Sequence, residues 1–330
     1  MRYLTIGSDP ARQRRVSQIA LGAMLMGTQT DEETSFAILD RYAEAGGNFI
    51  DTANNYAFWI NGTQGGESEQ LLGRWLSSRG DSNELTIATK VGGRPPQPAK
   101  VLSEKLEGLS PQVIKESLAR SLQNLGRDHV DVYYAHVPDP ATPLEEQVEA
   151  FGSHAAEGTI GLVGLSNFWA WEIERARKLA AAAGLPGCEV LQHHHTYFRG
   201  RTDQGGLRSK DGSIGVTSGE LLSYLRTEPG LTLVAYSPLL SGSYVRADKP
   251  LSELFDHAGT RKRQAALDEV VKETGATANQ VVLSWLMGGA VPIIPLVGAS
   301  SVAQIDETLA SVDLELTADQ RQRLDDAGGN

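Results

Sequence analysis

The feature that most constrains the fold of this chain is a regular alternation of short apolar runs with amphipathic segments. After an initial pair of runs, the pattern repeats through eight units, in which an apolar run precedes side chains spaced as on one helix face. Strict alternation predicts a parallel sheet, because each helix returns the chain to the start of the next strand. Eight units favour closure of that sheet into an α/β barrel of the (β/α)8 TIM type.

The initial pair, Tyr3 to Ile6 and Val16 to Leu21, flanks a polar turn and predicts an N-terminal β-hairpin. We expect inner strands at residues 18–22, 48–51, 85–89, 130–135, 162–165, 189–191, 231–235 and 291–294. We expect helices at residues 31–45, 68–76, 111–125, 144–155, 171–183, 219–226, 261–273, 278–287 and 302–310, and an extra C-terminal helix at 317–327. No break in composition divides the chain, so the prediction is one barrel domain spanning residues 1–330.

An open doubly wound sheet is the competing arrangement for alternating strands and helices. It would need a Gly-x-Gly-x-x-Gly fingerprint after an early strand, and the sequence has none. The nearest text, Gly158 to Gly164, has the wrong spacing and leads into a strand. The Gly-x-x-x-x-Gly-Lys-Ser/Thr phosphate loop is also absent, so the barrel is the preferred prediction.

Composition and charge argue against several classes of partner. The formal net charge of −11 makes a nucleic acid or an anionic membrane an unfavourable partner. The N-terminus lacks the apolar core of a signal peptide, and the most apolar window, Trp285 to Ala299, is interrupted by glycine and proline. Cys188 is the only cysteine, which excludes an internal disulfide. We therefore expect a soluble, cytoplasmic protein.

Polar side chains stand where the expected strands end. In chain order they are Asp51 with Tyr56, Lys90, His136, Ser166 with Asn167, Gln192, and Tyr236 with Ser237. In a barrel these ends ring a single mouth, where ligands bind. A lone lysine or histidine at a strand end is usually a solvated residue, but an acid, a phenol, a lysine and a histidine together indicate a catalytic set.

Such a set suits protonation of a carbonyl oxygen while hydride adds to the carbonyl carbon. Free tyrosine has a pKa of about 10, too high for rapid proton exchange near neutrality, and an adjacent ammonium lowers that value. We therefore assign Tyr56 as the proton donor, Lys90 as its electrostatic partner and Asp51 as the anchor of Lys90. His136 would position and polarise the carbonyl group.

Several of these segments occur in the same order in a known family. They are "NFIDTANNY", "IATK", "DVYYAH", "GLSNF" and "AYSPL", together with the N-terminal "MRYLTIG". Over nearly its whole length the sequence resembles the aldo-keto reductase superfamily, and most closely the bacterial branch that is also similar to potassium-channel β subunits. The resemblance implies an NAD(P)-dependent oxidoreductase that reduces an aldehyde or ketone, for example a sugar or secondary-metabolite carbonyl, with NADPH as its main cofactor.

The resemblance also implies which residues bind the cofactor. The positions that match the nicotinamide end are Gly22, Ala23, Met24, Asp51, Ser166, Asn167, Gln192 and Tyr236. Those that match the pyrophosphate loop are Ser237, Pro238, Leu239 and Ser241, and those that match the adenosine end are Gly298, Ala299, Ser300, Gln304, Glu307 and Thr308.

The substrate pocket is expected at Tyr56, His136 and Trp59, because Trp59 lies in a polar loop just past Tyr56. Two long insertions, residues 92–110 and 198–218, follow strand ends and would form the outer part of that pocket.

Two other groups of side chains need an interpretation. His193 and His195 would project to the same side of an extended segment, so a metal site is conceivable. No third ligand is evident beside them, and the favoured interpretation is a histidine-lined part of the pocket with no metal. Trp169 and Trp171 are expected to pack at the start of a helix.

Two alternative functions stay open at this point. One is a cofactor-binding regulatory subunit with little turnover, although the complete set of four candidate catalytic residues argues against it. The other is a metal-dependent barrel isomerase or aldolase built on His193 or His195, whose activity would need metal and no nicotinamide. The sequence specifies neither the physiological substrate and direction nor the oligomeric state.

Cofactor preference gives a first test. Family members with a strong preference for NADPH carry a lysine and an arginine near the positions that Gly298 and Gln304 occupy here. Ser300, Ser301 and the N–H groups of the following helix could still bind a phosphate. We expect NADPH to be used with a reduced advantage over NADH, measured as the ratio of kcat/KM values. A preference for NADPH above about a thousandfold, equivalent to about 4 kcal/mol, would contradict this expectation.

Overall fold

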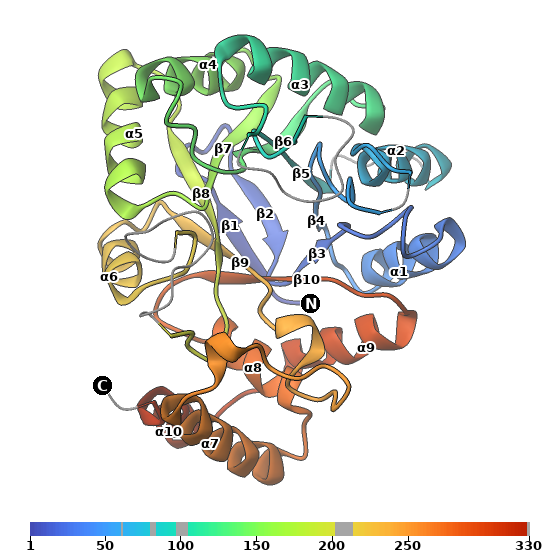
Figure 1. The fold of residues 1–330 in the computed structure, drawn as a ribbon, viewed down its shortest axis with the longest axis vertical. Helices are drawn as coiled ribbons and strands as arrows, with labels where there is room; N and C mark the ends of the chain where they lie inside the picture. The colour runs from blue at the N-terminus through green and yellow to red at the C-terminus, as the bar shows by residue number, and fades with distance from the viewer. Residues whose placement is uncertain (61, 80–83, 97–104, 202–213, 329–330) are drawn as a thin grey trace.

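The eight apolar runs form eight parallel strands that close into a barrel, in the order β10-β3-β4-β5-β6-β7-β8-β9, with helices around it (Figure 1). The computed structural model describes residues 1–60, 62–79, 84–96, 105–201 and 214–328. The predicted (β/α)8 barrel and its N-terminal hairpin are confirmed. Among the described residues, no helix combines the length and the apolar character that crossing a bilayer requires.

The strands are β1 Tyr3–Ile6, β2 Arg14–Ser17, β3 Ala20–Gly22, β4 Phe49–Asp51, β5 Thr86–Val91, β6 Val130–Ala135, β7 Ile160–Ser166, β8 Cys188–His194, β9 Thr232–Tyr236 and β10 Ile293–Val297. The helices are α1 Glu32–Glu44, α2 Glu67–Arg79, α3 Pro111–Leu125, α4 Leu144–Ala156, α5 Ala170–Ala183, α6 Gly219–Thr227, α7 Ala258–Thr274, α8 Ala278–Met287, α9 Val302–Ala310 and α10 Ala318–Asp326.

Among the inner strands, β8 and β10 extend furthest beyond their predicted carboxyl ends. Strand β8 continues through His194, because His193 and His194 stay extended and pair with Ala235 and Tyr236 of β9. Strand β10 continues past Pro295 to Val297, because a proline keeps its carbonyl and can occupy a strand position where its missing N–H is not needed.

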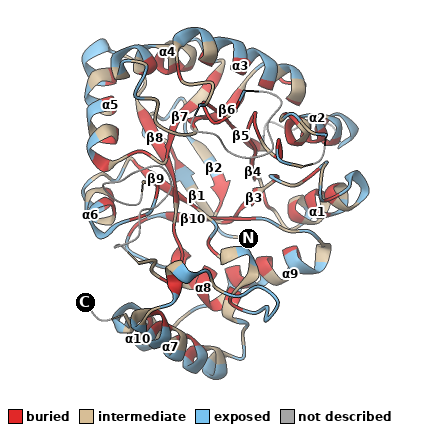
Figure 2. Cartoon of the chain, in the orientation of Figure 1, coloured by how far each residue is buried: buried red, intermediate tan, exposed pale blue. Residues whose placement is uncertain are grey.

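The strands divide the apolar core into two layers. Interior side chains, among them Phe49, Val132 and Val190, fill the barrel, while the opposite faces of the strands pack against the helices. Figure 2 shows this division, with buried residues along the strands and on the inner faces of the helices. Because side chains alternate along a strand, the residues two positions after an interior apolar residue also face inward, toward the mouth.

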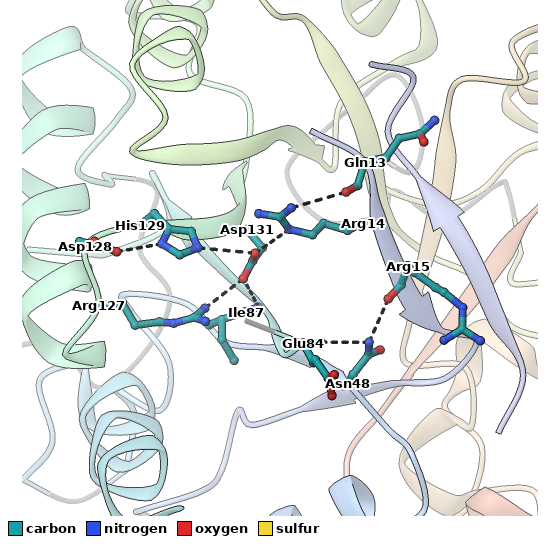
Figure 3. Close-up of polar contacts among 10 residues, drawn as sticks. All are labelled: Gln13, Arg14, Arg15, Asn48, Glu84, Ile87, Arg127, Asp128, His129 and Asp131. Atoms are coloured by element: carbon teal, nitrogen blue, oxygen red, sulfur yellow. Dashed lines mark hydrogen bonds and ion pairs between the residues drawn. The ribbon is translucent and has the colours of Figure 1, made fainter. Parts of the chain in front are cut away.

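The hairpin packs against the end of the barrel opposite that mouth. Ile6 and Val16 belong to the same apolar cluster as the barrel interior. Asp131, near the start of β6, accepts hydrogen bonds from Arg14 Nε at 2.8 Å, Arg127 Nη1 at 3.0 Å and the backbone N–H of Ile87 at 2.8 Å (Figure 3). The hairpin is thus tied to the amino ends of the strands, which leaves their carboxyl ends free for ligands.

Candidate functional site

The side chain of Lys90 joins the candidate residues at the mouth of the barrel. Its ammonium group donates to the carboxylate of Asp51, to the backbone carbonyl of Thr52 at 2.7 Å and to the Tyr56 hydroxyl at 2.8 Å. Asp51 and Lys90 are fully buried, on the adjacent strands β4 and β5. Three acceptors match the three N–H donors of an ammonium group, so the buried charge is fully hydrogen-bonded.

His136 follows β6 and lies beside Tyr56, with ring centroids 5.9 Å apart in an edge contact. Its backbone N–H donates to the carbonyl of Val91 at 2.8 Å, which holds it level with the end of β5. The structure therefore brings all four candidate catalytic residues together.

Tyr134 was not among the predicted site residues. Its ring centroid lies 5.8 Å from Lys90 Nζ, inside the barrel below the site. The alternation rule could have found it, because Tyr134 precedes His136 by two positions and shares its face of β6.

Burial controls the protonation of the site. It raises the pKa of Tyr56 well above 10, and the negative charge of Asp51 adds to the rise. Burial also lowers the pKa of Lys90, which Asp51 opposes, and raises the pKa of Asp51, which Lys90 opposes. Desolvation of the phenolate therefore sets the net direction of the Tyr56 pKa shift, while the adjacent Lys90 ammonium favours the phenolate and acts in the opposite sense. Tyr56 is a neutral phenol near pH 7.

Three of the residues expected at the nicotinamide end, Gln192, Asn167 and Tyr236, are linked to this centre by hydrogen bonds. Gln192 Nε2 donates to Asp51 at 2.8 Å. Asn167 Nδ2 donates to the carbonyl of His136 at 2.9 Å, while the Tyr236 hydroxyl donates to Asn167 Oδ1 at 2.9 Å. These bonds continue the polar contacts around the mouth from β4 to β9.

Backbone strain is concentrated in the same loops. The described residues include five non-glycine residues with positive φ, and all lie after strand ends: Ala57, Asn167, Ser237, Leu240 and Ser241. This conformation costs about 1 kcal/mol or more for a residue with a Cβ, and it is typical of ligand-binding turns. Three of the five form the loop after β9, which suits close approach of a ligand to the backbone. The donor set and these turns fit the nicotinamide and pyrophosphate of a dinucleotide.

The residues expected at the adenosine end lie after β10. Gln304 Oε1 accepts hydrogen bonds from the backbone N–H of Ser300 at 2.8 Å and from its hydroxyl at 3.1 Å. Glu307 accepts from Thr277 Oγ1 at 2.7 Å. The side chain of Gln304 thus already occupies the N–H and hydroxyl donors of Ser300, just before α9, that a phosphate would need.

Trp59 and Trp171 differ in exposure. Trp59 is 37% exposed at the mouth, and its ring meets Phe58 edge-on at 5.1 Å. Trp171, in the first turn of α5, is 61% exposed, so the expectation that it packs at the helix start is wrong. Of the two insertions, residues 97–104 and 202–213 lie outside the described residues.

The sequence profile described as the Aldo/keto reductase family matches residues 18–328. An uncharacterized oxidoreductase of Bacillus subtilis is 30% identical over 325 residues, covering 94% of this chain and 92% of the relative. A norsolorinic acid reductase of Emericella nidulans is 30% identical over 332 residues, covering 96% of this chain and 80% of the relative. An aryl-alcohol dehydrogenase of Pestalotiopsis microspora is 26% identical over 335 residues, covering 96% of this chain and 80% of the relative.

The three consecutive histidines do not form a common lining of the mouth. Gln192 faces the barrel interior, so the alternation of β8 turns His193 toward the helices and His194 toward the mouth, where its ring lies 5.6 Å from that of Tyr236. His195 packs against Trp285 of α8, with ring centroids 6.0 Å apart. Among the described residues, no group of three or more histidine, cysteine or acidic side chains is placed to hold a metal ion.

His193 should make the protein sensitive to acid. It is buried, neither ring nitrogen has a hydrogen-bond partner in the described part of the chain, and burial lowers its pKa from 6.5 to about 4. Between these pH values the unfolded chain binds a proton that the folded protein does not. The contribution of His193 to the free energy of unfolding is therefore complete above pH 6.5 and falls by about 3 kcal/mol toward pH 4.

We expect His193→Leu to keep or raise the free energy of unfolding at pH 7, because an apolar side chain needs no partner there. Between pH 7 and pH 4.5 the variant should lose about 2 kcal/mol less than the wild type. Urea denaturation at the two pH values measures both quantities. Equal losses in the two proteins would show that His193 does not titrate on unfolding.

Proposed function

Because the chain belongs to the aldo/keto reductase family, we propose that it reduces an aldehyde or ketone to an alcohol with a nicotinamide cofactor. One observation carries the proposal: the Tyr56 hydroxyl lies 2.8 Å from the buried Lys90 ammonium, beside His136, at the open end of the barrel. Assignment to the branch related to channel β subunits, use of NADP and a cytoplasmic location are further parts of the proposal, which rest on the sequence alone.

The chemistry uses two transfers. A nicotinamide cofactor held at the mouth would supply the hydride for the carbonyl carbon, and Tyr56 would donate its hydroxyl proton to the carbonyl oxygen. Lys90 stabilises the phenolate that remains, because its ammonium already contacts the hydroxyl oxygen. Asp51 holds Lys90, and His136 orients the carbonyl for both transfers.

The remaining residues would bind the cofactor. Ser166, Asn167 and Gln192 offer hydrogen-bonding groups for the carboxamide, and the ring of Tyr236 offers a stacking surface. The hydrogen bonds of Gln304 to Ser300 support a reduced advantage of NADPH, because a 2′-phosphate would have to displace that side chain.

The mouth favours a neutral, apolar substrate. Residues 16–30 and 52–66, which include the loops after β3 and β4, contain no acidic residue, lysine or arginine. These loops also expose Met24 and Trp59, and Trp59 follows Tyr56 by three positions. A carbonyl compound with an aromatic or other apolar body would bury this surface, whereas a phosphorylated sugar or a keto acid would find no cation in these two loops.

Replacement of the proton donor tests the reaction. Tyr56→Phe removes the hydroxyl and keeps the ring, so we expect the variant to fold and to bind NADPH with a similar Kd. Its kcat for an aromatic aldehyde, measured from the rate of NADPH oxidation, should fall by at least a thousandfold. Activity within a few-fold of the wild type would rule out the proton-donor role, and a wild type without turnover would favour a regulatory subunit.

A matched pair of tryptophan variants tests the substrate class. Trp59→Ala should lower kcat/KM for 2-naphthaldehyde about tenfold, equivalent to about 1.4 kcal/mol of lost apolar contact. The kcat/KM for glyceraldehyde should change less, because glyceraldehyde has little apolar surface. Trp171→Ala removes a more exposed tryptophan on α5 and should leave both values within twofold. A wild type that prefers glyceraldehyde or 4-carboxybenzaldehyde over 2-naphthaldehyde would contradict the apolar assignment.

A further inference from the structure

The loop that follows β5 lies directly against His136. A Cβ atom placed on Gly93 would be 2.8 Å from His136 Nδ1, closer than side-chain carbons approach other atoms. Asn55 Nδ2 donates to the Gly93 carbonyl at 2.7 Å, which ties this loop to the residue before Tyr56. The Gly92–Arg94 loop therefore forms one wall of the space in which the imidazole lies.

A single carboxylate oxygen accepts hydrogen bonds from two backbone N–H groups of this loop. Glu107 Oε1 accepts from the backbone N–H groups of Gly92 at 2.8 Å and Arg94 at 3.3 Å. The same oxygen accepts from Asn54 Nδ2 at 2.9 Å, two residues before Tyr56. Glu107 also donates its own N–H to the carbonyl of Arg94 at 2.8 Å.

These hydrogen bonds satisfy the backbone N–H groups of Gly92 and Arg94, whereas the other contacts of the described part of the loop, from Asn55 to the Gly93 carbonyl and from Arg94 Nη2 to the Gly65 carbonyl at 2.7 Å, do not. Gly92 and Gly93 have no side chains to pack, and both are buried. Loss of the acceptor would leave their segment with unsatisfied buried N–H groups, and the loop would move to reach water. That movement would release the wall against which the His136 imidazole lies.

We propose that Glu107 is a positioning residue for carbonyl reduction: through the Gly92–Arg94 loop it holds the imidazole of His136 in the orientation that the substrate oxygen requires. The proposal rests on the proposed function, because the role of His136 is part of that function. It concerns a residue outside the four candidate catalytic residues, with no contact to the reacting atoms.

Two substitutions of Glu107 separate hydrogen bonding from charge. In Glu107→Gln the amide oxygen can take the place of Oε1 and keep all three donors, while the amide nitrogen faces Ser117 Oγ, now 3.5 Å from Oε2. Glu107→Leu removes every acceptor. With 2-naphthaldehyde and NADPH we expect the kcat/KM of Glu107→Gln to stay within about threefold of the wild-type value. The kcat/KM of Glu107→Leu should fall about thirtyfold. The Kd for NADPH should stay within twofold in both.

A double-mutant cycle identifies the route of the effect. If Glu107 acts through His136, Glu107→Leu introduced into a His136→Ala protein should lower kcat/KM by no more than about threefold. Gly93→Ala provides an independent variant, because its methyl group would displace the imidazole without removing Glu107. It should cost at least tenfold alone and about threefold or less beside His136→Ala, where the contact with the imidazole is gone and that with Asn55 Nδ2 at 3.1 Å remains.

Glu172→Leu serves as the matched control, because Glu172 accepts a backbone N–H at the start of α5, at 2.9 Å from Trp169 N, away from this loop. It should keep the wild-type kcat/KM. Should Glu107→Leu lose its native circular dichroism, Glu107→Asp, whose shorter side chain withdraws the carboxylate from the loop, replaces it in both comparisons. Losses that multiply fully with His136→Ala, or a Gln variant as impaired as Leu, overturn this inference in an active enzyme. An inactive wild type overturns the proposed function and this inference with it.

Discussion

The structure around the mouth depends on one buried ion pair, Lys90 with Asp51. Two charges removed from water are costly, and their attraction compensates only if every remaining donor and acceptor is satisfied. Here the backbone carbonyl of Thr52 and the hydroxyl of Tyr56 accept the other hydrogen bonds of the ammonium group, while Gln192 donates a hydrogen bond to the carboxylate. The pair therefore fixes the position of the Tyr56 hydroxyl through a directional hydrogen bond, which an apolar contact does not provide.

The barrel supplies the conditions under which that pair is tolerated. Adjacent parallel strands set the register that places Lys90 beyond Asp51, and the apolar interior below excludes water from both. The hairpin packs against the opposite end, where Asp131 receives Arg14 and Arg127. The candidate catalytic and cofactor-binding groups gather at the mouth instead, and the strained turns after β7 and β9 lie at that same end.

Three properties of the site depend on tertiary structure that the sequence interpretation did not include. The face on which a side chain lies depends on whether its residue still belongs to the strand. Because β8 continues through His194, His193 lies on the face that is turned away from the mouth. Trp171 follows the same logic, because a helical position near a boundary is buried or exposed according to the angle at which the helix begins. The pKa of Tyr56 depends on the depth of burial, which adjacency to a lysine does not reveal.

The sequence by itself determined the number and order of the strands, and it placed Asp51, Lys90 and His136 at or next to strand ends, because hydrophobic periodicity and its polar interruptions are local properties of the chain. Only the tertiary structure decided which side chains touch, because contacts such as Glu107 with Asn54 or Tyr134 with Lys90 depend on strand register and barrel closure. The same closure sets the desolvation that governs protonation at the site. Local patterns carry no record of these distances, since they arise when residues far apart in the chain are brought together.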